Sequence, residues 1–280
     1  MKTIKSLTLA SLILLMCSCE KFTTESENVS EASATNNVSL QVTENEAVKT
    51  ACQRLSFGIF KVDEKIKTVN QTLDDTDFGT AHLSLSPGTY RIVAIGHNGS
   101  GNCTISSPEK VTFYNNKMTD TFSYYGTIEV NDGENTSETL TLKRAVAMFR
   151  LHITDSIPSN AKRIKFYYTG GSSTLNATTG YGCVNSKQTE TFDMSSTQKD
   201  YEIYTFPHED GKKLKIVVSV LDDNGTTIVS KTFEDVTVTQ NYITKYSGKL
   251  FDDVTSGDSG NIDIDFVFNP EWAGETVFYF

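Results

Sequence analysis

The 280-residue sequence has few of the residue patterns that catalysis, metal binding or cofactor binding require. Its five cysteines and four histidines fall into no zinc-ligand spacing. No G-x-S-x-G nucleophile elbow is present. The glycine-rich stretch at residues 96–101 is followed by no helical pattern that would present amide groups to a phosphate. We therefore expect a non-enzymatic protein with no catalytic residues, no metal and no cofactor.

Basic residues are also scarce, since 25 Lys and Arg stand against 35 Asp and Glu, a formal net charge of −10. This balance argues against nucleic acid as a partner, because a polyanion is attracted by clustered positive charge. Acidic clusters at residues 74–77 and 252–265 do not match the twelve-residue spacing of a calcium loop, and we expect solvated loop carboxylates there. The charge itself is typical of a surface-exposed domain and identifies no ligand.

No apolar run approaches the roughly 20 residues that a membrane-spanning helix needs. The apolar run at residues 7–16 follows Lys2 and Lys5, and it ends in Met16-Cys17-Ser18-Cys19. This is the pattern of a secretion signal with a lipobox, which we prefer to a permanent transmembrane helix. The small Ser18 favours Cys19 over Cys17 as the acylated residue. Residues 1–18 are thus predicted to be a lipoprotein signal peptide.

After cleavage, Cys19 would carry fatty acyl chains, palmitate among them, and would hold the protein at the membrane. Residues 19–37 are rich in Glu, Ser, Thr and Asn and are predicted to be a flexible acylated leash. Three cysteines remain in the mature chain: Cys52, Cys103 and Cys183. An export route permits one disulfide with one thiol left over, but three widely separated cysteines are more typical of small buried apolar residues.

From Val38 onward, short segments rich in Val, Ile, Phe, Tyr and Thr alternate with clusters of Gly, Asn, Asp and Ser, and no helical period is visible. Residues 90–95 are apolar on both faces, as in a central strand. Asp223-Asn224-Gly225 joins two such runs as a hairpin. The sequence predicts an all-β protein of two β-sandwiches, residues 38–140 and residues 141–280, the second with a terminal strand.

A family resemblance appears mainly in the second half, at residues 142–151 (Leu-Lys-Arg-Ala-Val-Ala-Met-Phe-Arg-Leu), 156–158 (Ser-Ile-Pro), 167–170, 179–180 and 241–251, together with Pro87-Gly88-Thr89-Tyr90 in the first half. These stretches and the lipobox resemble the FimB-like fimbrial subunit family of Bacteroidales. The resemblance implies two transthyretin-like, Greek-key β-sandwiches in a lipoprotein of a type V pilus. It implies an outer-membrane anchor or an accessory subunit of the fimbrium, exposed on the cell surface and active in cell adhesion. No catalytic residues come with it.

Members of such pili join by strand donation, so the resemblance implies shaft or accessory subunits as partners. Stalk subunits lose an N-terminal strand to an arginine-specific protease, whereas anchors keep it. Here Lys49 and Arg54 lie within or beside the first strands, which favours an unprocessed anchor.

The C-terminus offers two apolar segments. Ile262, Ile264, Phe266 and Phe268 share one face of a predicted strand, which belongs either to its own sandwich or to a partner's sheet. The last four residues, Val277, Phe278, Tyr279 and Phe280, pose the same choice. They are the better donor candidate, because they follow Pro270 and Gly274 and so can leave the domain.

A second hypothesis is a surface glycan-binding lipoprotein, because 16 Phe and 12 Tyr could supply stacking surfaces. Tyr124-Tyr125 and Tyr167-Tyr168 are such pairs. Neighbours in a strand point to opposite faces, so only one tyrosine of each pair can be exposed on a given side. Any host or glycan ligand stays unidentified at this point.

Overall fold

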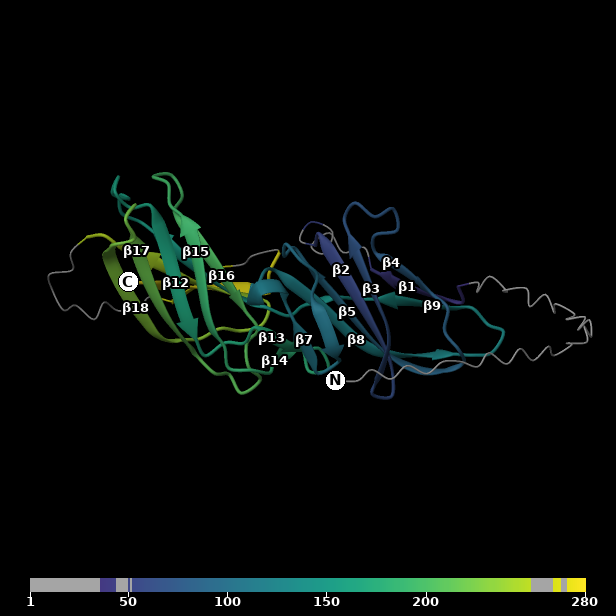
Figure 1. Ribbon diagram of the computed structural model, residues 1–280. Coiled ribbons are helices and arrows are strands. Elements are labelled where there is room, and N and C mark those ends of the chain that lie inside the picture. Colours follow the sequence, from purple (N-terminus) through teal and green to yellow (C-terminus); the bar gives the residue numbers. More distant parts are fainter. Residues whose placement is uncertain (1–35, 44–49, 51, 253–263, 268–270) are drawn as a thin grey trace, which may run out of the picture. The chain divides into compact units, whose positions relative to one another are not determined.

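The computed structural model describes residues 36–43, 50, 52–252, 264–267 and 271–280 (Figure 1). In this part of the chain the regular elements are twenty-one strands and one 3₁₀ turn, Tyr114–Asn116. The all-β class predicted from the sequence is thereby confirmed. The predicted signal peptide, Cys19 and nearly all of the predicted leash lie outside the described residues, as does Lys49.

The first half of the fold packs two sheets against each other. The smaller sheet has the order β4-β1-β9, formed by Thr80–Leu83, Val38–Val42 and Thr136–Leu140. The larger has the order β10-β8-β5-β2-β3, formed by Lys143–Arg144, Thr121–Val130, Gly88–His97, Arg54–Lys61 and Glu64–Thr72. The core between them is mainly aliphatic, with Leu40, Ile59, Leu83 and Ile92 fully buried.

Strand β5 is the centre of the larger sheet, as its apolar sequence predicts. It pairs antiparallel with β2 on one side and with β8 on the other, so both of its edges are used. Residues 92–97 are all buried. Strand β2 is likewise buried on both faces, because the small Ser56 and Gly58 separate its large apolar side chains.

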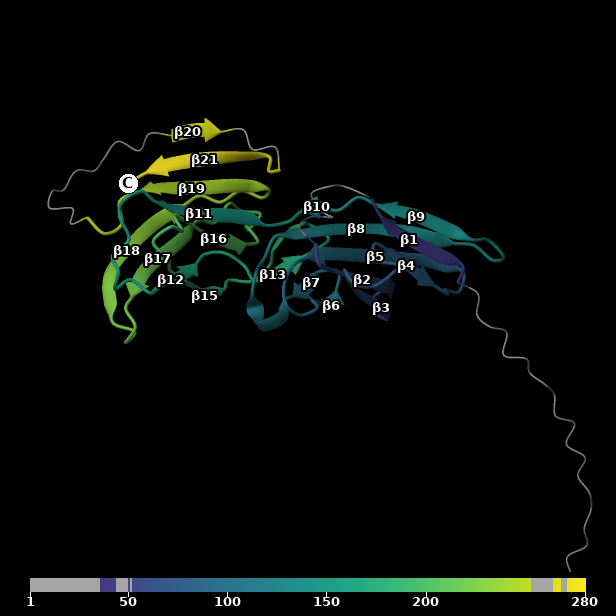
Figure 2. The same cartoon turned by 90° about the horizontal axis from the view of Figure 1, so that it is seen from above.

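The second half again contains two sheets. One has the order β16-β11-β19-β21-β20, formed by Asp200–Thr205, Ala147–Ile153, Tyr242–Gly248, Gly274–Tyr279 and Ile264–Val267 (Figure 2). The other has the order β15-β12-β17-β18, formed by Lys187–Asp193, Arg163–Thr169, Leu214–Leu221 and Thr227–Val236. Aromatic rings from both sheets meet in the core, among them Phe149, Phe166 and Phe233.

A fifth, smaller sheet draws on both halves of the sequence. Its order is β14-β13-β7-β6, formed by Tyr181–Gly182, Thr174–Asn176, Lys110–Thr112 and Thr104–Ser107. The pairing of β7 with β13 joins a hairpin of the first half to one of the second. Phe60, Val93, Val146 and Phe206 belong to one buried cluster, which also spans the two halves. Residues 36–280 accordingly form one compact unit.

The structure contains strands that the sequence did not predict. Strands β3 and β15 carry mostly polar, exposed side chains, and apolar patterning did not predict them. The hairpin at Asp222–Gly225 is present between β17 and β18. The last strand of the first half, β10, lies just beyond the expected boundary at residue 140; the transthyretin-like assignment stays a prediction.

Candidate functional site

The first three residues of the segment predicted as a donor strand, 277–279, form the second half of β21, inside the chain's own second half. Strand β21 pairs in parallel with β19 and antiparallel with β20. The Phe278 ring stacks on Tyr246 at 4.9 Å between centroids, and the Phe280 ring meets Phe233 at 5.0 Å. The end of the strand also depends on Gly248, since a Cβ atom there would lie 2.0 Å from the carbonyl oxygen of Phe280.

Ionic contacts hold the beginning of strand β21 to the neighbouring strands. Glu275 is only 6% exposed, and its carboxylate lies 3.4 Å from Arg150 Nη1 and 3.8 Å from Lys245 Nζ. Arg150 also pairs with Glu202 at 2.7 Å. These residues come from four adjacent strands, β21, β19, β11 and β16, so the charges form a row across the sheet. A buried carboxylate with two cationic neighbours is compensated in charge.

The residues leading into β21 are fixed by a buried arginine. The guanidinium of Arg144 binds Asp120 through two hydrogen bonds, Nε to Oδ1 at 2.7 Å and Nη2 to Oδ2 at 2.9 Å. Its Nη1 donates to Asn241 Oδ1 at 3.1 Å and to the backbone carbonyl of Glu271. Arginine suits this position because its planar group donates several hydrogen bonds in fixed directions.

The same guanidinium lies over two aromatic rings. Its central carbon is 3.9 Å from the ring centroid of Trp272 and 4.7 Å from that of Phe122. The Trp272 ring also stacks on Tyr204. Because Trp272 directly precedes Ala273 and β21, Arg144 ties the entry of the C-terminal strand to β8 and its preceding loop. We call this set, Arg144 with Asp120, Phe122, Asn241 and Trp272, the Arg144 cluster.

Strands β1 and β20 have different surroundings. Strand β1 lies between β4 and β9 and buries Val38, Leu40 and Val42. Among the described strands, β20 is the outermost of its sheet, with β21 as its neighbour. Its outer edge is therefore a place where another strand could pair.

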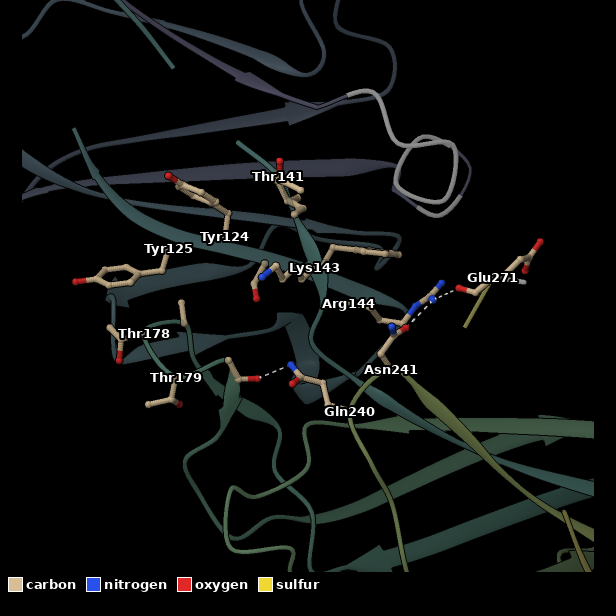
Figure 3. A pocket seen from close by; sticks show the side chains of 15 residues that line it. Tyr124, Tyr125, Thr141, Lys143, Arg144, Thr178, Thr179, Gln240, Asn241 and Glu271 are labelled. Atoms are coloured by element: carbon tan, nitrogen blue, oxygen red, sulfur yellow. Dashed lines mark hydrogen bonds between the residues drawn. The ribbon is translucent and has the colours of Figure 1, made fainter. Parts of the chain in front are cut away.

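An open pocket of about 870 Å³ lies beside the Arg144 cluster (Figure 3). It is lined by residues 122–125 of β8, by residues 141–144, by residues 177–180, and by Gln240, Asn241 and Glu271. Figure 3 shows Tyr124 and Tyr125 toward one end and Arg144 and Asn241 toward the other. Sequence reasoning singled out Tyr124 and Tyr125 as an aromatic pair but could not place them beside residues more than 50 positions away.

Hydrogen bonds fix the two loops that complete the pocket. Gln240 Nε2 donates to the carbonyl oxygen of Gly180 at 3.0 Å, which links one loop to the other. The backbone N–H and hydroxyl of Thr178 both donate to Asn176 Oδ1. Burial, and secondarily the charge of Glu138, raises the pKa of Tyr124, so its hydroxyl stays protonated at neutral pH.

The titratable groups noted in the sequence do not converge. His97 is buried, and burial together with Arg54 lowers its pKa to about 4. Cys52 and Cys103 are buried free thiols, whereas Cys183 is a free, exposed one, so no disulfide forms among them. No group of three metal-binding side chains occurs among the described residues. Within that same part of the chain, no helix has the length and apolar character to cross a membrane.

Three comparisons place this fold among known proteins. The family model of fimbrillin-A associated anchor proteins Mfa1 and Mfa2 matches residues 28–274. A candidate adhesin from Bacteroides ovatus is similar in structure, with a TM-score of 0.52 at 11% identity, covering 78% of this chain and 87% of that one. The fimbrial anchor protein Mfa2 from Porphyromonas gingivalis matches with a TM-score of 0.38 at 12% identity, over 69% of this chain and 80% of its own. No curated protein sequence matches the chain.

The family match covers most of the sequence, including both halves of the fold, and ends at Gly274, the first residue of β21. It confirms the resemblance to fimbrial anchor proteins that the sequence motifs indicated. The chain belongs to the family of fimbrillin-A associated anchor proteins.

Proposed function

We propose that this protein is a lipid-anchored structural subunit of a cell-surface pilus, held in the outer membrane through acylated Cys19 and joined to neighbouring subunits by β-strand addition. The family membership carries this proposal, because it makes the protein a pilus-associated subunit at the cell surface. The lipobox at residues 16–19 supports the lipid anchor. Strand addition is supported by the place of β21 next to the edge of its sheet and by the outer edge of β20.

In this proposal the C-terminal residues Val277, Phe278, Tyr279 and Phe280 are the strand that a neighbour takes up. Removing β21 from its own sheet breaks its pairing with β19 and exposes the Tyr246 and Phe233 rings. The exchange therefore requires a neighbour whose groove offers equivalent backbone pairing and apolar contacts. Simple deletion of residues 270–280 is a poor test, because it would also damage the hydrophobic core of the second half.

A reversible lock tests the donated strand without deletion. Ser247 and Tyr279 are paired residues of β19 and β21. Cysteines at both positions, in a Cys183→Ser background, would form a disulfide across adjacent strands when oxidised. If β21 is donated, the oxidised protein fails to recover pilus subunits from solubilised outer membrane, and the same protein after reduction recovers them. Equal recovery in the two states would exclude donation of β21.

Addition at the edge of β20 has its own test. Successive backbone N–H groups of a strand point to its two opposite edges. Asp265→Pro and Phe266→Pro therefore each remove one N–H group, on different edges of β20. One substitution disturbs the β20–β21 pairing and the other only the outer edge. If one of the two variants no longer recovers its partner but keeps its melting temperature, edge addition is supported. Full recovery in both variants contradicts it.

The lipid anchor is tested by Cys19→Ala. We expect the variant to incorporate no labelled palmitate and to leave the membrane fraction, because the acyl chains supply most of the membrane affinity. Cys17→Ala is the matched control and should be labelled normally. Labelling of Cys19→Ala with loss of labelling in Cys17→Ala would move the anchor to Cys17.

A further inference from the structure

No residue of β20 or β21 lines the pocket beside the Arg144 cluster, yet its lining is organised. One end is formed by Tyr124, whose ring lies over Gly126 two residues further along β8. A Cβ atom at Gly126 would lie 2.3 Å from Tyr124 Oη and 2.8 Å from its Cζ. Glycine is unfavourable inside a strand and often marks a close approach of another group. Here its absent side chain lets the Tyr124 ring lie along the strand at the pocket wall.

Most of the remaining wall carries hydrogen-bonding groups that are neutral. Thr141, Thr178, Thr179 and Gln240 line the pocket. Each of these side chains already makes a hydrogen bond within the protein, to Thr43, Asn176 or Gly180, and keeps acceptor capacity for a ligand. The guanidinium of Arg144 is already paired with Asp120 and covered by two rings, so it is a poor site for a further anion. Lys143 is an exposed cation in the lining. An aromatic ring beside hydroxyl and amide groups suits a ligand with C–H faces and many hydroxyls.

We propose that this pocket binds a short oligosaccharide, with the Tyr124 ring stacking on a sugar ring and the threonine hydroxyls and Gln240 hydrogen-bonding its hydroxyl groups. The pocket volume lies within the usual range for ligand sites. Electron-rich ring faces attract the weakly positive C–H groups of a sugar. This binding activity is separate from the structural role in the pilus and does not depend on how subunits join.

The single tryptophan provides a direct reporter. Trp272 is the only tryptophan in the sequence, it follows Glu271 of the lining, and it contacts Arg144. The full mature chain with Cys19→Ala is titrated with xylotriose, cellotriose, mannotriose and trigalacturonic acid, alongside a printed glycan array. We expect a saturable change in Trp272 fluorescence with at least one probe, with a Kd of about 1 mM or tighter.

Substitutions then locate the site. Tyr124→Leu keeps an apolar side chain against the core but removes the ring face, and we expect binding to weaken by about tenfold. Tyr124→Phe keeps the ring and should bind within about twofold of the unchanged protein. Gly126→Ser pushes the ring away without changing any lining group and should weaken binding as Tyr124→Leu does. Tyr167→Leu alters an exposed tyrosine of β12 outside the pocket and is the matched control.

The proposal is overturned if neither the four probes nor the array gives saturable binding. It is also overturned if Tyr124→Leu and Tyr167→Leu bind a probe equally well. Recovery of a pilus subunit that depends on Tyr124, with no saccharide retained, would reassign the pocket to a protein partner. None of these outcomes bears on the disulfide lock of β21, so the two proposals fail independently.

Discussion

The first and last described strands, β1 and β21, have similar positions within their sheets but are held there by different forces. Each lies between one parallel and one antiparallel neighbour. Strand β1 is fixed by regular alternation, with Val38, Leu40 and Val42 buried and Gln41 exposed. Strand β21 is fixed by a buried carboxylate, by stacked rings and, through Trp272, by the Arg144 cluster.

This difference indicates how each strand could be released. Apolar burial is non-directional and is lost in proportion to the exposed area. Ionic and ring contacts depend on geometry, so one substitution can weaken several of them together. We therefore expect β1 to behave as a permanent part of its sandwich and β21 to be the more readily switched strand. The following experiments test that contrast, from the largest expected effect to the smallest.

Arg144→Ala should have the largest effect on stability. It leaves the Asp120 carboxylate, whose side chain is 14% exposed, without its partner, and removes the cation from the Trp272 ring. Breaking a buried pair from one side lowers the free energy of unfolding by about 3–5 kcal/mol. Urea denaturation measures the loss, and red-shifted Trp272 emission would show that the entry to β21 has loosened. A loss below about 1 kcal/mol would mean that β21 does not depend on this cluster.

Leu40→Ala tests how strongly the burial of apolar side chains stabilises β1 in its sheet. Leu40 is fully buried, and truncation should lower the free energy of unfolding by about 3 kcal/mol through lost burial and a cavity. Gln41→Ala in the same strand is the control, with an expected change within about 0.5 kcal/mol. Trp272 emission should stay unchanged below the unfolding transition. An early shift of that emission would show that the two ends of the fold are coupled.

Acid should destabilise the first half through His97. Its pKa in the folded protein is about 4, whereas an unfolded histidine titrates near 6.5. The unfolded chain therefore takes up a proton before the folded chain does, so stability falls as the pH decreases from about 6.5 to 4. The loss attributable to this group is about 2–3 kcal/mol over that window. The difference in pH profile between the unchanged protein and His97→Asn measures it, and parallel profiles would contradict it.

Lys245→Met should have the smallest effect. Lys245 lies 3.8 Å from Glu275 and is partly exposed, while Arg150 still compensates the carboxylate. We expect a loss of about 0.5 kcal/mol that shrinks at high salt. Denaturation at low and high ionic strength checks this. A loss comparable to that of Arg144→Ala would mean that the row of charges, and not the Arg144 cluster, holds β21.

Patterns along single strands made much of the fold predictable. The apolar run at residues 90–95 predicted a central strand, and Asp223-Asn224-Gly225 predicted a hairpin; both are present. Strands β3 and β15 escaped prediction because their side chains are largely solvent-exposed, and only backbone pairing with β2 and β12 makes them strands. The Arg144 cluster escaped as well, since its members lie up to 152 positions apart between Asp120 and Trp272.

The amino-acid sequence by itself determined the all-β class and the family, because short apolar runs and turn residues act locally and leave a readable pattern. Only the tertiary structure decided where the C-terminal strand lies, that Tyr124, Thr178 and Gln240 line one pocket, and that Arg144 joins β8 to the entry of β21. These are contacts between segments distant in the chain, and their free energies depend on geometry that no local pattern encodes.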